Sequence, residues 1–137
     1  MLSNDAAILV VDDAVTMRAL IKDYLKKMGY SNIFEARNVE EATQTFERLE
    51  SQGVRLEFVF ADMNMPGGTG IDFLKKIRAL PQGKNLPFVM ITTEGEMNTV
   101  TEAVMNGVSG YLLKPVTQPA LMEKMVEAYK KHHQEKL

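Results

Sequence analysis

Five short apolar runs alternate along the chain with longer segments in which apolar residues recur every three or four positions. The runs cover residues 6–11, 33–36, 58–61, 88–91 and 110–113. They are rich in Val, Ile, Phe or Leu and lack polar alternation, which is typical of strands buried on both faces of a parallel sheet. The pattern therefore predicts five parallel strands.

The segments between these runs have the spacing of amphipathic helices. The first predicted helix ends at Gly29, and the second opens at Asn38, with Glu41 three residues later as a capping residue. A third helix is predicted over about 70–80 and a fourth over about 96–105. The fifth begins after Thr117, with five residues expected to face the core: Leu121, Met122, Met125, Val126 and Tyr129.

Five strand–helix repeats indicate an open, doubly wound α/β sheet with right-handed crossovers. The length of 137 residues fits one domain over residues 1–137, and we expect no effector domain.

Composition removes several classes of function. The chain has no Cys, so disulfides, thiolate metal sites and a cysteine nucleophile are excluded. A net charge of −2 without a long basic block argues against nucleic-acid binding. No apolar run approaches the ~20 residues of a membrane span, and no signal peptide is visible. We expect a cytoplasmic protein without membrane insertion.

Chemistry-bearing residues stand where the predicted strands end. The first run stops at Asp12-Asp13, the third at Asp62, the fourth at Thr92 and the fifth at Lys114. In open α/β sheets, ligands bind outside the carboxyl ends of the strands. These side chains are therefore expected to converge at one edge of the sheet.

Three gathered carboxylates call for a cation. Two like charges ~4 Å apart repel by about 4 kcal/mol at an effective dielectric constant near 20. Oxygen ligands beside phosphate chemistry favour Mg²⁺. With the ammonium of Lys114 and the hydroxyl of Thr92, the set suits a phosphoryl group. The attacking group must be a carboxylate, because Cys is absent and His132 and His133 are distant in the sequence.

Four motifs together resemble the response-regulator receiver domains, most closely the single-domain chemotaxis (CheY-like) regulators. They are Val-Val-Asp-Asp at 10–13, Ala-Asp-Met-Asn-Met-Pro at 61–66, Met-Ile-Thr-Thr at 90–93 and Gly-Tyr-Leu-Leu-Lys-Pro at 110–115. The resemblance implies a flavodoxin-like five-stranded parallel sheet of order 2-1-3-4-5 with five helices.

The resemblance also implies roles for individual residues. Asp62 would accept the phosphoryl group; Asp13 and Asp62 would bind Mg²⁺ directly, and Asp12 would orient metal-bound water. The Asn64 backbone carbonyl would be a further metal ligand. Lys114 would pair with the oxygens of the acyl phosphate. The peptide bond between Lys114 and Pro115 matches one that is often cis in the family.

Further roles concern switching and lifetime. By resemblance, Thr92 would bind the phosphoryl group and move inward, and the Tyr111 side chain would follow it. Asn64 and Glu94 would tune the lifetime of the phosphorylated form. The loop Gly67-Gly68-Thr69-Gly70 departs from the family pattern and is expected to be mobile, with Thr69 capping the next helix.

The leading hypothesis is a stand-alone response regulator, in chemotaxis or motility, that signals by binding and is not an enzyme beyond self-dephosphorylation. We expect the protein to be a monomer and a histidine kinase to donate the phosphoryl group to it. A protein target or phosphatase would bind the fourth helix, fifth strand and fifth helix, where four residues are expected to be exposed: Met97, Val100, Val104 and Lys124.

Three alternatives remain. A phosphate sink or relay would have the same chemistry without a direct target. A small Mg²⁺ phosphohydrolase with an aspartyl nucleophile is less favoured, because such enzymes carry Asp-x-Asp after the first strand, where this chain has Asp12-Asp13-Ala14. An FMN-binding flavodoxin is disfavoured because two carboxylates stand where its phosphate loop would lie.

Overall fold

Strands and helices alternate along the chain. The computed structural model describes residues 2–65, 67–93 and 97–133. The strands are β1 (Ala7–Val11), β2 (Ile33–Ala36), β3 (Leu56–Asp62), β4 (Asn64–Met65), β5 (Gly68–Thr69), β6 (Phe88–Thr92) and β7 (Gly110–Leu113). The helices are α1 (Val15–Lys27), α2 (Val39–Ser51), α3 (Gly70–Ala79), the short 3₁₀ helix η1 (Pro81–Gly83), α4 (Met97–Met105) and α5 (Gln118–His133). Among the described residues, no helix combines the length and apolar character that a membrane crossing needs.

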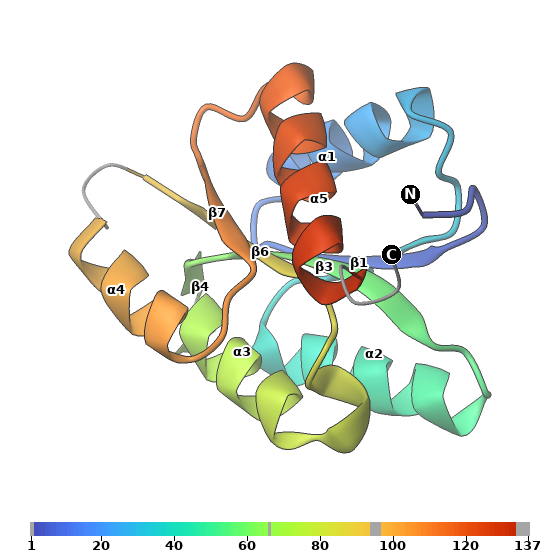
Figure 1. Ribbon diagram of the computed structural model, residues 1–137, viewed down its shortest axis with the longest axis horizontal. Coiled ribbons are helices and arrows are strands. Elements are labelled where there is room, and N and C mark those ends of the chain that lie inside the picture. The colour runs from blue at the N-terminus through green and yellow to red at the C-terminus, as the bar shows by residue number, and fades with distance from the viewer. Residues whose placement is uncertain (1, 66, 94–96, 134–137) are drawn as a thin grey trace.

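Five strands form one parallel sheet of order β2-β1-β3-β6-β7. Counted along the chain, these strands are in the order 2-1-3-4-5 that was expected. Helices cover both faces: α1 and α5 lie on one side, and α2, α3 and α4 on the other (Figure 1). The flavodoxin-like α/β fold is therefore confirmed.

The sheet separates two apolar layers, and alternate residues of β1 contribute to each. Leu9 and Val11 belong to the layer under α2 and α3, together with Phe73. Ile8 and Val10 belong to the layer under α1 and α5. Successive side chains of a strand point to opposite faces, so a strand covered on both sides must be apolar throughout.

The prediction that every strand is buried on both faces is wrong for the two edges. Ile33 and Phe34 of β2 are half-buried, as is Tyr111 of β7, and Leu113 is 37% exposed. Each edge strand has a neighbour on one side only, so the helices cover it less completely than the three central strands.

Capping side chains mark two helix starts as the sequence predicts. The Asn38 side chain accepts a hydrogen bond from the Glu41 backbone N–H at 2.8 Å, opening α2. Thr69 and Asp72 form a reciprocal capping box that opens α3. At the first turn of α1, by contrast, the N-cap Ala14 makes no side-chain hydrogen bond.

Two predicted side-chain orientations on the last helices are wrong. Met122 was expected inside but is 43% exposed, because Leu121 and Met125 occupy the inward positions of α5. Val100 was expected outside but is 8% exposed and shares the inner face of α4 with Ala103. Val104 is exposed as expected. The side chain of Met97, which was also expected to be exposed, and residue 96, the predicted start of the fourth helix, lie outside the described part of the chain.

Candidate functional site: an acidic cluster at the carboxyl edge of the sheet

Three aspartates meet at the carboxyl ends of two neighbouring strands. Asp62 is the last residue of β3, and Asp12 and Asp13 follow β1, which pairs with β3 in parallel. One carboxylate oxygen from each lies within 4.8 Å of the others. Asp12 and Asp62 are buried, whereas Asp13 is exposed. The predicted convergence of these three carboxylates is therefore present.

The environment of Asp12 is unfavourable for a buried carboxylate. Its Oδ1 accepts a hydrogen bond from the Ala14 N–H at 2.8 Å, but its Oδ2 has no hydrogen-bond partner among the described groups. Burial raises the pKa of the Asp12 carboxyl; the Ala14 hydrogen bond and the charge of Lys114 lower it, and the Asp13 carboxylate raises it. A buried carboxylate oxygen without a donor fits a position next to a cation.

Lys114 supplies a positive charge next to Asp62. Its Nζ lies 3.2 Å from Asp62 Oδ1, and its side chain is 27% exposed. The backbone N–H of Lys114 donates to the Thr92 carbonyl at 2.8 Å, and the peptide bond to Pro115 is cis, as the resemblance implied. The end of β7 thus carries the ammonium to the acidic cluster.

Thr92 and Tyr111 occupy adjacent strands beside this edge. Thr92 ends β6 and is completely buried, with its hydroxyl 3.4 Å from the Thr93 carbonyl oxygen. Tyr111 is half-buried on β7, and the Lys124 ammonium lies 5.7 Å from the centre of its ring. These positions connect the site to α5, while the switching roles of both residues stay predictions.

Of the two residues expected to tune the lifetime of the phosphorylated form, the structure describes only Asn64. Asn64 is exposed and pairs with Thr69 in the hairpin of β4 and β5. Glu94 lies outside the described residues. The metal-ligand role of the Asn64 carbonyl also stays a prediction.

That hairpin was not predicted from the sequence, which indicated only a mobile loop over 67–70. Gly67 has φ of +80°, a left-handed conformation that glycine adopts without steric cost. Gly70 lies so close to β3 that a Cβ there would be 2.5 Å from the Asp62 carbonyl oxygen and 2.5 Å from Met90 Sδ. The glycines, noted only as a source of mobility, therefore allow close packing against the site.

A second missed feature is Arg18, a buried cation beneath the acidic loop. Its Nη1 donates to the Asp12 carbonyl at 2.6 Å, and its Nε donates to Glu35 Oε1 at 3.1 Å. Its sequence signal was available, because Arg18, Ile21 and Leu25 share the helical spacing of one face and all three are buried.

His132, near the C-terminal end of α5, is half-buried and hydrogen-bonded. Its Nε2 lies 2.6 Å from Ser109 Oγ, which accepts hydrogen bonds from the Phe88 N–H and from Arg78 Nη2. With both acceptor positions used, the Ser109 hydroxyl donates to a neutral His132. This cluster lies at the amino ends of β6 and β7, away from the aspartates.

The residues present fit a hard divalent cation. The donor set consists of carboxylate oxygens alone, one of them buried without a partner, and neighbouring Asp13 is open to solvent. Mg²⁺ prefers one or two carboxylates and keeps several waters, which requires such an open side.

Comparisons with known proteins agree with this geometry. Residues 8–126 match the response regulator receiver domain. The chain is 40% identical to the chemotaxis protein CheY of Pseudomonas aeruginosa, over 90% of this chain and 96% of that protein. It is 40% identical to CheY1 of Helicobacter pylori, over 86% of this chain and 92% of that protein.

Similarity in three dimensions leads to the same family. A high-resolution structure of the chemotaxis response regulator CheY4 of Vibrio cholerae superimposes with a TM-score of 0.78 at 30% identity, covering 90% of this chain and 98% of that one. The chain therefore belongs to the response regulator receiver domains and is a CheY-like response regulator of two-component signalling.

Proposed function

We propose that Asp62 accepts a phosphoryl group from a histidine kinase in the presence of Mg²⁺, and that the phosphorylated chain binds a protein target in chemotaxis or motility signalling. The observation that supports this proposal is the placement of Asp62 next to charges of both signs. Asp12 and Asp13 each offer a carboxylate oxygen within 4.8 Å of one from Asp62, and the Lys114 ammonium lies 3.2 Å from Asp62 Oδ1.

The transfer requires little covalent chemistry from the protein. A carboxylate oxygen of Asp62 attacks phosphorus as the phosphorus–nitrogen bond of the donor phosphohistidine breaks, and an acyl phosphate forms. Asp13 and Asp62 would hold Mg²⁺, with Asp12 orienting metal-bound water, and the ion would neutralise charge on the phosphoryl oxygens. Lys114 pairs with one phosphoryl oxygen, and the Thr92 hydroxyl donates to another.

The change at Asp62 reaches the surface through adjacent elements. Phosphorylation replaces the single negative charge of the Asp62 carboxylate with roughly −2 on a phosphoryl group next to Asp12 and Asp13, which favours an inward movement of the Thr92 hydroxyl. Tyr111 lies on the next strand and in contact range of Lys124 of α5. The proposed output surface is therefore formed by α4, β7 and α5.

Exposed apolar side chains support this choice of surface. Val104 and Met105 of α4, Leu113 of β7 and Met122 of α5 are all at least 37% exposed. Val15 is the one other large apolar residue with comparable exposure among the described residues. Exposed apolar side chains are typical of a protein-binding surface.

The phosphorylation step is tested with purified protein, Mg²⁺ and acetyl phosphate. We expect mass spectrometry to find one labile phosphoryl group, on Asp62. Asp62→Asn and a sample containing excess chelator are the controls. A protein that stays unmodified, or is modified elsewhere, would contradict the proposal.

The binding step needs its own experiment because a phosphate sink or relay has the same chemistry. Beryllofluoride-activated protein should retain a partner that the untreated protein does not, and Val104→Asp together with Met122→Asp should abolish that retention. Failure to retain any partner would favour the sink or relay. Sustained turnover of a phosphomonoester would instead favour the small phosphohydrolase.

A further inference from the structure

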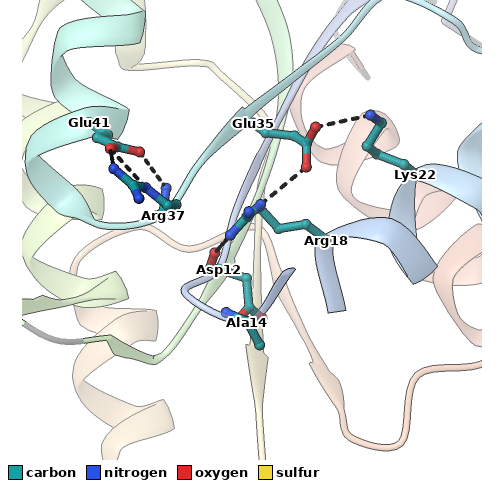
Figure 2. A network of polar contacts seen from close by, with 7 residues as sticks. All are labelled: Asp12, Ala14, Arg18, Lys22, Glu35, Arg37 and Glu41. Carbon is teal, nitrogen blue, oxygen red and sulfur yellow. Dashed lines mark hydrogen bonds and ion pairs between the residues drawn. The ribbon is translucent and has the colours of Figure 1, made fainter. Parts of the chain in front are cut away.

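Arg18 joins three parts of the chain beneath the acidic cluster. It belongs to α1, donates from Nη1 to the Asp12 carbonyl at 2.6 Å, and donates from Nε to Glu35 Oε1 of β2 at 3.1 Å. Lys22, one turn further along α1, donates to Glu35 Oε2 at 2.9 Å. Figure 2 shows this network, in which the Arg18 guanidinium lies between the Asp12 backbone and the Glu35 carboxylate.

The carbonyl that Arg18 binds belongs to the peptide bond between Asp12 and Asp13. A peptide unit is planar, so fixing the direction of this carbonyl also fixes the N–H of Asp13 and the path of its Cα. The Asp12 N–H is already held by the Ala36 carbonyl at 3.0 Å. Arg18 therefore provides the constraint on the far side of Asp12, where the chain leaves the sheet.

Few other contacts hold this turn. The N-cap Ala14 of α1 makes no side-chain hydrogen bond, and the first turn of α1 has no acidic residue. The Ala14 N–H donates to Asp12 Oδ1, which uses the metal-site carboxylate itself. Arg18 is thus the side chain outside the acidic cluster that ties the Asp12 backbone to the body of the fold.

The geometry suits arginine in particular. Its planar guanidinium presents several donors in a fixed arrangement, so one group can bind a carbonyl and a carboxylate together, which a lysine ammonium does less specifically. Glu35 is held as an anion: hydrogen bonds from Lys22 and then Arg18 lower the pKa of its carboxyl. Arg18 itself is 9% exposed, so the Glu35 carboxylate is the partner that a buried cation requires.

The contribution of Arg18 to the acidic cluster is geometric more than electrostatic. The guanidinium contacts the Asp12 backbone oxygen and no carboxylate of the cluster. A replacement that keeps the positive charge but not the planar donors should therefore still impair the site.

We propose that Arg18, held in place by Glu35, is a positioning residue for the metal site, and that it fixes the Asp12–Asp13 peptide so that the three carboxylates meet in one arrangement. This inference rests on the proposed Mg²⁺ site.

The test compares Mg²⁺ affinity, measured by calorimetric titration, across matched variants. Groups that orient metal ligands typically change affinity by 10- to 100-fold when replaced. We expect Arg18→Lys to weaken Mg²⁺ binding about tenfold and Glu35→Gln to weaken it by a smaller factor. Arg37→Lys is the matched control, because Arg37 forms an exposed ion pair with Glu41 near the same edge and does not contact Asp12 (Figure 2).

Two further measurements separate positioning from a general loss of stability. Ile77→Val removes a methylene from the buried core in the last turn of α3, and we expect its Mg²⁺ affinity to equal that of the unmodified protein. In metal-free Arg18→Lys, the backbone amide resonances of Asp13 and Ala14 should shift in NMR spectra more than those of the Ser109 region.

The outcomes distinguish this inference from the proposed function. If the unmodified chain binds no Mg²⁺, the proposed function fails and this inference fails with it. If the unmodified chain binds Mg²⁺ and is phosphorylated on Asp62 but folded Arg18→Lys binds Mg²⁺ equally well, the inference alone is overturned. Should Arg18→Lys not fold, equal affinity in Glu35→Gln and the unmodified protein would overturn it.

Discussion

Replacing Asp12 with Asn should stabilise the metal-free protein. The substitution keeps the shape of the side chain and removes one negative charge from a completely buried position. It also places an amide where Oδ2 now lacks a partner, facing carboxylates that can accept its hydrogen bonds. Asp12→Asn thus removes repulsion and adds donors at the same place.

The magnitude follows from the separations in the cluster. Two like charges 4.8 Å apart repel by about 3–4 kcal/mol at an effective dielectric constant near 20. The Lys114 ammonium, 3.2 Å from Asp62, offsets part of this repulsion, and Asp13 is exposed and screened by solvent. We therefore expect a net gain of about 1–2 kcal/mol, which for a domain of this size raises the melting temperature by about 4–8 °C.

The assay is thermal unfolding followed by circular dichroism, in chelator and in millimolar Mg²⁺. In chelator, Asp12→Asn should melt above the unmodified protein. Mg²⁺ should raise the melting temperature of the unmodified protein more than that of the variant, because a ligand stabilises by binding the folded state and the variant binds it more weakly. Glu57→Gln is the control, since it removes one negative charge from an exposed position on β3.

Three results would refute this reasoning. A metal-free Asp12→Asn protein that melts at or below the temperature of the unmodified protein would mean that the carboxylates are not in mutual repulsion. An equal response of both proteins to Mg²⁺ would mean that Asp12 does not contribute to the metal site. A gain in Glu57→Gln as large as in Asp12→Asn would assign the effect to net charge alone.

Three further predictions concern other parts of the molecule. Burial and the charge of Arg78 lower the pKa of His132 to about 4, so folding stability should fall as pH decreases from about 6.5 to about 4. Over this pH range, chemical denaturation should show that the free energy of unfolding of His132→Gln falls by about 1 kcal/mol less than that of the unmodified protein, after allowance for partial solvent screening. Equal losses of unfolding free energy in the two proteins would exclude His132 as the cause. Gly70→Ala should cost about 1–3 kcal/mol of stability and slow phosphorylation, because its Cβ would lie 2.5 Å from a backbone oxygen at the end of β3; Gly110→Ala, with open space around its Cβ, should be nearly neutral in the same melts. Replacing Asn64 and Glu94 together by Ala should change the dephosphorylation rate in a phosphate-release assay, and an unchanged rate would remove their proposed role.

Hydrophobic periodicity was sufficient for the five strands of the main sheet and the five α-helices, but not for the hairpin of β4 and β5. The runs at 33–36 and 110–113 coincide with β2 and β7, and the cap at Asn38 opens α2 as predicted. These features depend on neighbours in the chain, because side-chain direction and capping are set within a few residues. Strand order came from the family resemblance, since five similar apolar runs do not specify their own arrangement.

The acidic site was predictable because its position follows from topology. Once the strands are parallel, their carboxyl ends lie at one edge, and residues at those ends meet whatever their separation in the sequence. Asp12, Asp62 and Lys114 come together for this reason. The sequence did not reveal that Asp12 is fully buried with one oxygen unpartnered, because that depends on how closely the surrounding loops pack.

What tertiary structure decided is which polar groups are removed from water. The pattern of α1 places Arg18 on the buried face, but only contact with β2 and the Asp12 carbonyl gives that cation its partners. His132 similarly becomes half-buried because the end of α5 packs over Ser109. Local sequence determines helix, strand and cap, whereas burial and pairing of charges depend on groups brought together from distant positions, and these set the chemistry of the site.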